Sequence, residues 1–184
     1  MAAPSDRPVL VVIDVQRAVL HGAVDAAGVV RRINDLLTRA RSNGVPAVFI
    51  QHEDPDDPLM RNGSEGWQLV DGLEVEEHEV VIAKRYRDSF ASTSLGAHLE
   101  ELGATRLILV GAQSDYCVQA TTFSALHHGF DVTLVSDAHT TCATGEGPGD
   151  LTGEQIISFI NSNVTWLTHP GGSVRVEPAK DLAL

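Results

Sequence analysis

The most constraining feature of this sequence is a set of short, continuous apolar runs, most of them followed by a polar residue or a glycine. The first is PVLVVIDV at residues 8–15, where Asp14 interrupts an otherwise aliphatic stretch. An apolar run without alternation predicts a strand that is buried on both faces, as in a parallel sheet. Further strands are predicted at residues 45–50, 80–83, 107–110, 132–135 and, more briefly, 174–176.

Between these runs, apolar residues recur at helical spacing. Residues 29–40 and 95–102 show this spacing, and each segment is followed by a glycine that is typical of a helix end. Residues 117–128 predict a third helix, and the capping box TGEQ at residues 152–155 precedes a fourth. Because strand and helix alternate, we predict an α/β fold: a three-layer sandwich with a doubly wound, mostly parallel sheet.

Length and charge narrow the class of protein. A chain of 184 residues is expected to form one domain, residues 1–184, with a full core. The net charge of −12 argues against nucleic-acid binding, and no apolar run is long enough to span a membrane. Residues 1–8 lack the layout of a secretion signal, so we expect a cytoplasmic protein whose two cysteines are free thiols.

Three polar residues with complementary chemistry stand at the ends of predicted strands. Asp14 lies near the end of the first strand, Lys84 follows the third, and Cys117 comes soon after the fourth. Ligands of such sheets bind beyond the carboxyl ends of the strands, so we expect these side chains to converge. Each of them alone has an ordinary structural explanation, as a capping aspartate, a solvated lysine or a small buried cysteine.

The expected convergence would suit a nucleophilic thiol. A thiol reacts as the thiolate, and both a helix N-terminus and a neighbouring ammonium lower its pKa. We therefore expect the start of the helix and Lys84 to favour the thiolate of Cys117. Asp14 is placed to take the thiol proton and return it to a leaving amine.

The motifs around these residues resemble those of the isochorismatase-like superfamily of cysteine hydrolases. They read VVIDVQ, AKRYRDSF and GAQSDYCVQATT, and the block VTLVSDAHTT is similar as well. The resemblance spans nearly the whole chain, and relatives of this type include nicotinamidases, N-carbamoylsarcosine amidases and streptothricin hydrolases. It implies a Rossmann-like fold and a hydrolase that cleaves a C–N bond other than a peptide bond through a thioester. A small amide, ureide or lactam is the expected substrate.

The resemblance also assigns roles to residues. It implies a catalytic triad with Cys117 as nucleophile, Asp14 as general base and acid, and Lys84 to polarise the pair. A cis peptide is expected between Ala112 and Gln113, with an oxyanion hole formed by the backbone N–H groups of Gln113 and Cys117. True isochorismatases carry an aspartate at the nucleophile position, so a cysteine there argues against that reaction.

Metal binding is less well supported by the motifs. Nicotinamidases bind a metal through an Asp-x-His pair after the second strand, whereas this chain reads IQHEDPDDP there. We expect no metal and no cofactor, although a site formed by His52, Asp54 and His78 stays open.

Substrate contacts are expected from five residues near the strand ends: Gln16, Trp67, Tyr86, Phe90 and Tyr116. The aromatic members of this set could equally belong to the core. The long, irregular segment at residues 53–79 is typical of a lid or a pocket wall.

The same segment suggests an assembly. Its apolar residues need cover, which either this domain or a partner could provide. Because relatives of this type form dimers or larger assemblies, we expect a homodimer or larger homo-oligomer with Trp67 at the contact.

Two interpretations from other classes stay open. The first is a non-catalytic binding or assembly protein on the same fold. The second is a thiol redox protein, in which Cys142 would have to act as the resolving thiol. A metal-assisted nicotinamidase and an isochorismatase are further alternatives, and the motifs do not select one substrate.

Overall fold

The computed structural model describes residues 6–184, so residues 1–5, which entered the expectation about a secretion signal, lie outside it. Its centre is a six-stranded sheet in the order β3-β2-β1-β4-β5-β6, and every neighbouring pair is parallel. The strands are β1 (Pro8–Ile13), β2 (Ala47–His52), β3 (Val80–Lys84), β4 (Arg106–Ala112), β5 (Asp131–Thr140) and β6 (Val174–Glu177). This sheet confirms the predicted α/β architecture.

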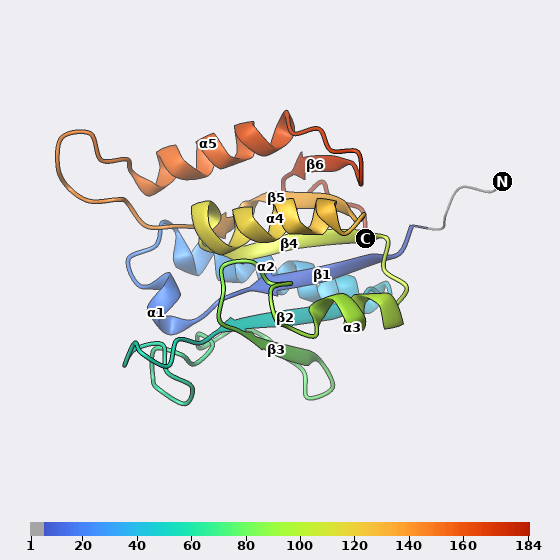
Figure 1. Cartoon of the computed structure of the whole chain (residues 1–184), viewed down its shortest axis with the longest axis horizontal. Coiled ribbons are helices and arrows are strands. Elements are labelled where there is room, and N and C mark those ends of the chain that lie inside the picture. The colour runs from blue at the N-terminus through green and yellow to red at the C-terminus, as the bar shows by residue number, and fades with distance from the viewer. Residues whose placement is uncertain (1–5) are drawn as a thin grey trace.

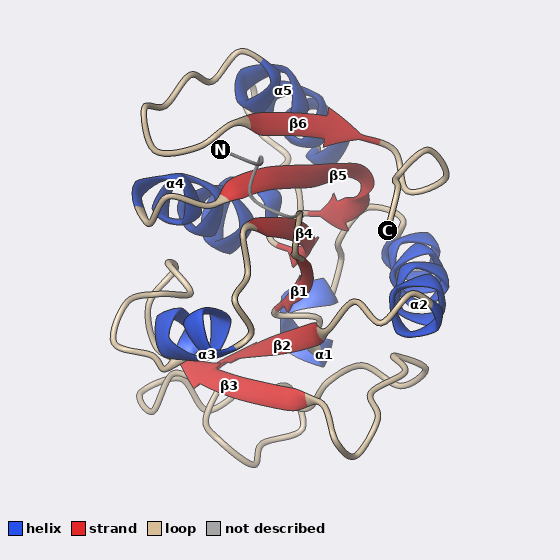
Figure 2. Cartoon of the chain, turned by 90° about the vertical axis from the view of Figure 1, so that its right-hand side faces the viewer, coloured by secondary structure: helices blue, strands red, loops and turns tan. Residues whose placement is uncertain are grey.

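Helices cover both faces of the sheet, as the three-layer prediction requires (Figure 2). The helices are α1 (Arg17–Leu20), α2 (Ala26–Ser42), α3 (Leu95–Glu101), α4 (Gln119–His127) and α5 (Gly153–Thr165), with a π-helical turn, η1 (Ser114–Val118), before α4. Helix α2 packs on one face, and α3, α4 and α5 pack on the other. None of the helices within residues 6–184 has the length and apolar character needed to cross a membrane.

The burial of β1 explains its continuous apolar sequence. Leu10 and Val12 belong to the core beneath α2, whereas Val9 and Val11 belong to the core on the opposite face. Successive side chains of a strand point to opposite faces, so a central strand with helices on both sides has no solvent-facing position. Figure 1 shows β1 between β2 and β4, at the middle of the sheet.

The strand order places a crevice beside β1. The chain passes from β1 to β2 and β3 on one side, and then crosses to β4 on the other side of β1. Connections therefore leave the carboxyl ends of β1 and β4 in opposite directions, which is where parallel sheets of this kind bind ligands.

Some local predictions need correction. β1 ends at Ile13 rather than residue 15, and the four-residue helix α1 was not predicted. β5 continues through a polar stretch to Thr140, with a register shift against β4. Cys117 lies inside η1 rather than opening a regular helix. The predicted capping box is confirmed, since Thr152 and Gln155 exchange hydrogen bonds at the start of α5.

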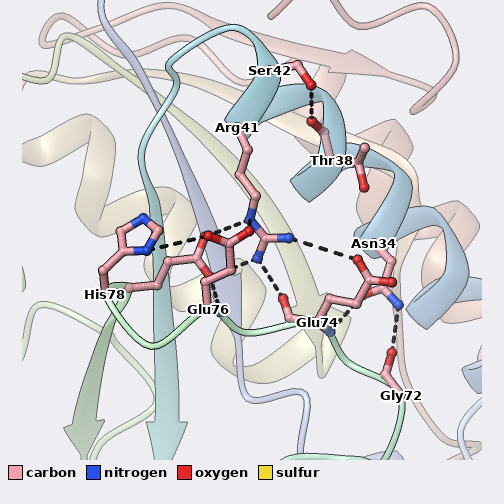
Figure 3. Close-up of polar contacts among 9 residues, drawn as sticks. Asn34, Thr38, Arg41, Ser42, Gly72, Glu74, Glu76 and His78 are labelled. Carbon is pink, nitrogen blue, oxygen red and sulfur yellow. Dashed lines mark hydrogen bonds and ion pairs between the residues drawn. The ribbon is translucent and has the colours of Figure 1, made fainter.

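The C-terminal end of the segment between β2 and β3 is held to α2 by hydrogen bonds and ion pairs (Figure 3). The guanidinium of Arg41 donates at 3.0 and 2.8 Å to the buried carboxylate of Glu79, and at 2.8 Å to the carbonyl of Glu74. About two turns earlier on the same face of α2, the Asn34 amide donates to the carbonyl of Gly72 at 2.6 Å and accepts from the N–H of Glu74. Residues 72–79 therefore run along α2 before they enter β3.

Candidate active site

Three polar side chains from three strand ends meet at the carboxyl edge of the sheet. Asp14 directly follows β1, Lys84 is the last residue of β3, and Cys117 lies in η1 after β4. Nζ of Lys84 lies 2.7 Å from Oδ2 of Asp14, and both side chains are at most 1% exposed. The thiol of Cys117 lies within hydrogen-bonding reach of both groups. The structure thus brings together the residues that the sequence placed at one edge.

The backbone around Asp14 is held in an unusual conformation. Its φ is 49°, in the left-handed region that non-glycine residues rarely adopt. On the neighbouring strand, Gly111 has a φ of 116°, and a Cβ at this position would overlap the carbonyl oxygen of Ile13. The ends of β1 and β4 can approach this closely because residue 111 has no side chain.

The ammonium of Lys84 is oriented by the chain that follows it. It donates to the carbonyl of Tyr86 at 3.0 Å and to that of Arg87 at 3.4 Å, in addition to its ion pair with Asp14. An ammonium has three donors, and these contacts provide three acceptors. A fully buried lysine is thereby held with its charge beside the carboxylate.

Burial dominates the electrostatics of Asp14. Removal from water raises the pKa of this carboxyl above its ordinary value, and the charge of Lys84 opposes part of the rise. Among residues 6–184, no group donates a well-aligned hydrogen bond to either carboxylate oxygen. Asp14 is therefore a buried acid with free acceptor capacity, poised to bind a proton.

The pKa of Cys117 is raised rather than lowered, contrary to the expectation that its surroundings favour the thiolate. Burial and the neighbouring Asp14 carboxylate raise the pKa of Cys117 to about 12, although Lys84 opposes the rise. The prediction considered the ammonium and the helix but not the burial of the sulfur or the repulsion between two anions. The surroundings of the sulfur therefore favour the thiol over the thiolate.

The chain turns sharply between β4 and Cys117. The peptide bond between Ala112 and Gln113 is cis, as the family resemblance implied. The carbonyl of Gln113 accepts hydrogen bonds from the N–H groups of Tyr116 and Val118, both at 3.1 Å. These bonds close η1 around Cys117, and both Gln113 and Cys117 face the same cavity.

A cavity of 340 Å³ opens onto the cluster. Its walls come from the ends of β1 and β2, from α1, from the segment after β2 and from η1. The lining residues are Asp14, Ala18, Val19, His52, Asp57, Leu59, Met60, Arg87, Gln113, Tyr116 and Cys117. Residues 57–60 form part of this wall, which confirms the interpretation of the long segment as a pocket wall.

Of the five predicted substrate contacts, Tyr116 lines the cavity. Its ring carries the guanidinium of Arg87, whose Cζ lies 4.1 Å from the ring centroid. Arg87 was not predicted, although it stands inside the AKRYRDSF motif. A motif shows that a residue is near the lysine, but not whether its side chain reaches the cavity.

Gln16 and Trp67 do not line the cavity. The buried amide of Gln16 donates at 2.8 Å to the carbonyls of His52 and Trp67, and accepts from the N–H of His52. The Trp67 carbonyl also accepts from Gln51 at 2.9 Å. The side chain of Gln16 thus joins the ends of β1 and β2 to the segment that follows β2. Its place in the sequence, two residues after Asp14, is equally compatible with this structural role and with a contact to a ligand.

Tyr86 and Phe90 also lie outside the cavity lining. Tyr86 is exposed, and its contribution to the cluster is the backbone carbonyl that accepts from Lys84. The ring of Phe90 stacks on His128 and Phe130, with centroids 4.5 and 6.1 Å apart, and packs against the core beneath α4. Phe90 is therefore a packing residue, which was the alternative considered for the aromatic residues.

The three candidate metal ligands are not brought together. His52 lines the cavity at the end of β2, in register with Lys84, whereas His78 lies near α2, with Nδ1 3.4 Å from Glu76. Within residues 6–184, no three His, Cys, Asp or Glu side chains form a group that could hold a metal ion. Burial and the charge of Lys84 lower the pKa of His52, which favours the neutral ring.

Both cysteines are free thiols, as expected. Cys142, after β5, accepts a hydrogen bond from the side-chain amide of Gln113 at 3.4 Å and lies 3.4 Å from the carbonyl of His21. It contacts the turn before Cys117 but does not line the cavity.

The Isochorismatase domain family matches residues 8–148. This chain belongs to the isochorismatase family. The match contains Asp14, Lys84 and Cys117, and it ends before α5. The family assignment therefore covers the whole cluster at the carboxyl edge of the sheet.

Individual proteins that are similar to this chain in sequence or structure are consistent with its assignment to the isochorismatase family. Two streptothricin hydrolases from Streptomyces noursei are 38% and 40% identical over 157 and 135 residues, which cover 81% and 72% of this chain. The matched residues make up 62% and 49% of those relatives, so the chain spans less than two thirds of their length. An isochorismatase from Pseudomonas putida has a TM-score of 0.86 at 28% identity, and the alignment covers 100% of this chain and 94% of that one.

Proposed function

We propose that this chain is a single-domain cysteine hydrolase that cleaves a C–N bond in a small amide, ureide or lactam through a thioester. The observation that carries the proposal is the buried cluster of Asp14, Lys84 and Cys117 at the foot of a 340 Å³ cavity. A thiol, a proton acceptor and a fixed cation are the groups that nucleophilic catalysis on a carbonyl requires.

The first half of the reaction forms the thioester. Asp14 takes the proton of Cys117 as the sulfur attacks the carbonyl carbon, and the carbonyl π electrons move to oxygen. Backbone N–H groups of Gln113 and Cys117 would stabilise this oxyanion. The oxyanion then re-forms the carbonyl, the C–N bond breaks, and Asp14 gives its proton to the leaving nitrogen.

The second half returns the enzyme to its resting state. A water molecule enters after the amine leaves, and Asp14 removes one of its protons while the oxygen attacks the thioester carbon. Collapse of this second intermediate breaks the C–S bond, and the proton on Asp14 returns to the sulfur. The products are a carboxylic acid, or a carbamic acid from a ureide, and the protonated thiol of Cys117.

The raised pKa values suit this sequence of proton transfers. Cys117 and Asp14 both hold protons more strongly than in water, so one proton can move between them without a strong base. Lys84 lowers the energy of whichever partner is the anion, because it interacts with both groups. The site therefore works with a resting thiol and a thiolate that forms only during attack.

Relatives support the choice of substrate class. The streptothricin hydrolases named above are similar over most of this chain. The cavity volume suits a small molecule, and the net charge of −12 gives no electrostatic reason for a nucleic-acid partner. We further propose a cytoplasmic enzyme that needs no metal or other cofactor.

The test is a panel of primary amides, N-carbamoyl compounds, maleamate and streptothricin. The readout is release of ammonia or amine, or, for the streptothricin lactam, the mass gain of one water on ring opening. We expect Cys117→Ala to lower turnover at least about 1,000-fold, and acid quenching of the wild type to trap an acyl group on Cys117. Cys142→Ser is the matched control and should stay active. Full activity of Cys117→Ala on a confirmed substrate would overturn the mechanism.

Two further outcomes separate the alternatives. A redox protein would depend on both thiols, so equal losses in Cys117→Ala and Cys142→Ser would favour that class. Chelator treatment should leave the rate unchanged, and a loss that zinc restores would reverse the proposal of a metal-free reaction.

A further inference from the structure

Three buried polar side chains form a chain of hydrogen bonds behind the nucleophile turn. The hydroxyl of Ser114 in η1 lies 2.7 Å from Nδ1 of His139 in β5, and Nε2 of His139 lies 2.9 Å from Oδ1 of Asn161 in α5. The amide nitrogen of Asn161 donates at 2.9 Å to the carbonyl of Ser136. None of these residues has a step in the proposed mechanism.

The direction of each hydrogen bond follows from the last one. A backbone carbonyl only accepts, so the NH₂ group of Asn161 must face Ser136 and its oxygen must face His139. His139 therefore carries its proton on Nε2, and Nδ1 is a lone pair that can only accept from Ser114. Burial lowers the pKa of His139, which favours the neutral ring that this arrangement requires.

The network ends at the turn that carries Cys117. Ser114 is the first residue of η1 and directly follows Gln113, the residue after the cis peptide. His139 is paired in register with Gly111 at the end of β4. The hydroxyl of Ser114 is thus fixed from β5 and α5, and its position sets the path of the chain between Gln113 and Cys117.

We propose that Asn161, His139 and Ser114 are positioning residues that hold the turn at residues 113–117 so that the N–H groups of Gln113 and Cys117 are aimed at the substrate carbonyl oxygen. The inference rests on the proposed function, because an oxyanion forms only if Cys117 attacks a carbonyl. The three side chains act through the turn and touch no reacting atom. Loss of the Ser114 hydroxyl leaves a buried nitrogen of His139 without its donor, and the turn loses its anchor.

The test compares two reactions of the same sulfur. p-Nitrophenyl acetate acylates Cys117 through a tetrahedral oxyanion, whereas methyl methanethiosulfonate modifies the sulfur without one. We expect Ser114→Ala to lower the rate of acylation about tenfold to 100-fold, and to change modification at Cys117, followed by peptide mass, less than about twofold. Ser114→Thr, which keeps the hydroxyl, should restore acylation.

A matched control removes another buried hydroxyl next to the turn. Thr122 is fully buried in α4 and donates to the carbonyl of Val118, whereas the hydrogen bonds of the His139 ring go to Ser114 and Asn161. Thr122→Val should leave acylation within about twofold of the wild type. An equal loss in Thr122→Val would overturn the inference, because any buried hydroxyl would then have the same effect.

If Ser114→Ala does not fold, Asn161→Ala provides a second test. This variant removes the hydrogen bond from α5 to His139, and it should lower acylation of Cys117 but not modification by methyl methanethiosulfonate. Because the three residues act as a unit, Ser114→Ala combined with Asn161→Ala should lose less than the product of the single losses. If the wild type is acylated at Cys117 and Ser114→Ala is acylated equally fast, the inference about positioning is wrong but the proposed function stands. A wild type that shows no acylation of Cys117 would overturn the proposed function as well.

Discussion

Nζ of Lys84 lies 2.7 Å from Oδ2 of Asp14, and each of the two side chains is at most 1% exposed to solvent. A buried ion pair gains little net stability, because the loss of hydration offsets the attraction, but removal of one partner leaves the other charge uncompensated. This pair is therefore better explained by its effect on Cys117 than by its contribution to folding.

Lys84→Met should lower kcat at least about 100-fold with a small change in KM. Without the ammonium, the pKa values of Asp14 and Cys117 both rise further, so the base is protonated and the thiolate is harder to form. Steady-state kinetics on a confirmed substrate provide the measurement. Lys84→Arg should fail too, because a planar guanidinium cannot match three acceptors arranged around an ammonium; near-normal turnover of that variant would show that any nearby positive charge suffices.

The pH profile should report the protonation of Asp14. The base form is needed for catalysis and exists above the folded-state pKa, which burial raises above 3.8. The rate constant kcat/KM is therefore expected to fall with decreasing pH at a higher pH than an ordinary carboxyl would give. Lys84→Met should move this limb to still higher pH. A profile that stays flat down to the titration range of an exposed aspartate would contradict the assignment of Asp14 as base.

Alkylation of Cys117 by iodoacetamide should be slow at neutral pH and should still increase at about pH 10. The reason is the raised pKa of about 12, which leaves only a small fraction of thiolate at neutral pH. Peptide mass spectrometry over a series of pH values measures the rate at Cys117 separately from Cys142. Rapid labelling at neutral pH that saturates below pH 8 would show that Lys84 outweighs burial.

Arg87 is expected to favour substrates with a carboxylate near the scissile bond. Its guanidinium is held over the ring of Tyr116, both residues line the cavity, and among residues 6–184 no acidic side chain forms an ion pair with Arg87. Arg87→Gln should raise KM for maleamate about tenfold and leave KM for an uncharged amide nearly unchanged. Arg85→Gln is the control, because Arg85 pairs with Glu53 outside this cavity. Equal effects on both substrates would exclude anion recognition.

Gly111→Ala should lower the free energy of unfolding by about 3 kcal/mol or more, because the new Cβ overlaps the backbone of Ile13. Gly63 is a matched control, since it also has a positive φ but a Cβ added there would meet no atom within 4 Å. Gly63→Ala should cost only about 1 kcal/mol for its backbone conformation. Urea denaturation of both variants makes the comparison, and similar losses would mean that close strand packing is not the cause.

Assembly into a homodimer or larger homo-oligomer stays a prediction. Trp67 is partly buried in its own chain, and Met60 is covered, while Leu59 is 65% exposed. Light scattering should give at least the mass of a dimer for the wild type and a lower mass for Trp67→Ala. A wild type that is monomeric at micromolar concentration would contradict the assembly. Trp67→Ala that stays assembled but binds substrate weakly would instead show that Trp67 supports the cavity wall from behind.

The cluster was predictable because strand ends can be located from sequence. Continuous apolar runs locate the ends of β1 and β3 to within a few residues, and the geometry of a parallel sheet then brings Asp14 and Lys84 to one edge. The state of Cys117 was not predictable in the same way. Its pKa depends on how completely the sulfur is buried and how near Asp14 lies, and neither quantity is encoded in a local motif.

The remaining differences also have physical causes. β5 was predicted too short because Ser136, Asp137 and His139 interrupt its apolar pattern, yet pairing with the end of β4 at residues 139 and 140 continues the strand. Gln16 was expected to contact a substrate, but a buried amide satisfies backbone groups equally well. Side-chain partners of this kind depend on segments distant in the chain, so a single sequence does not identify them.

The clamp between α2 and residues 72–79 divides the long segment into a fixed and a variable part. Arg41 and Asn34 hold the chain before β3, and pairing of Lys84 with His52 of β2 places the lysine at the edge of the sheet, whereas residues 57–60 lie in the cavity wall. Insertions, deletions or substitutions in that wall can therefore accumulate while the lysine keeps its place. A fold organised in this way can acquire new substrates over evolutionary time without rebuilding its reactive centre.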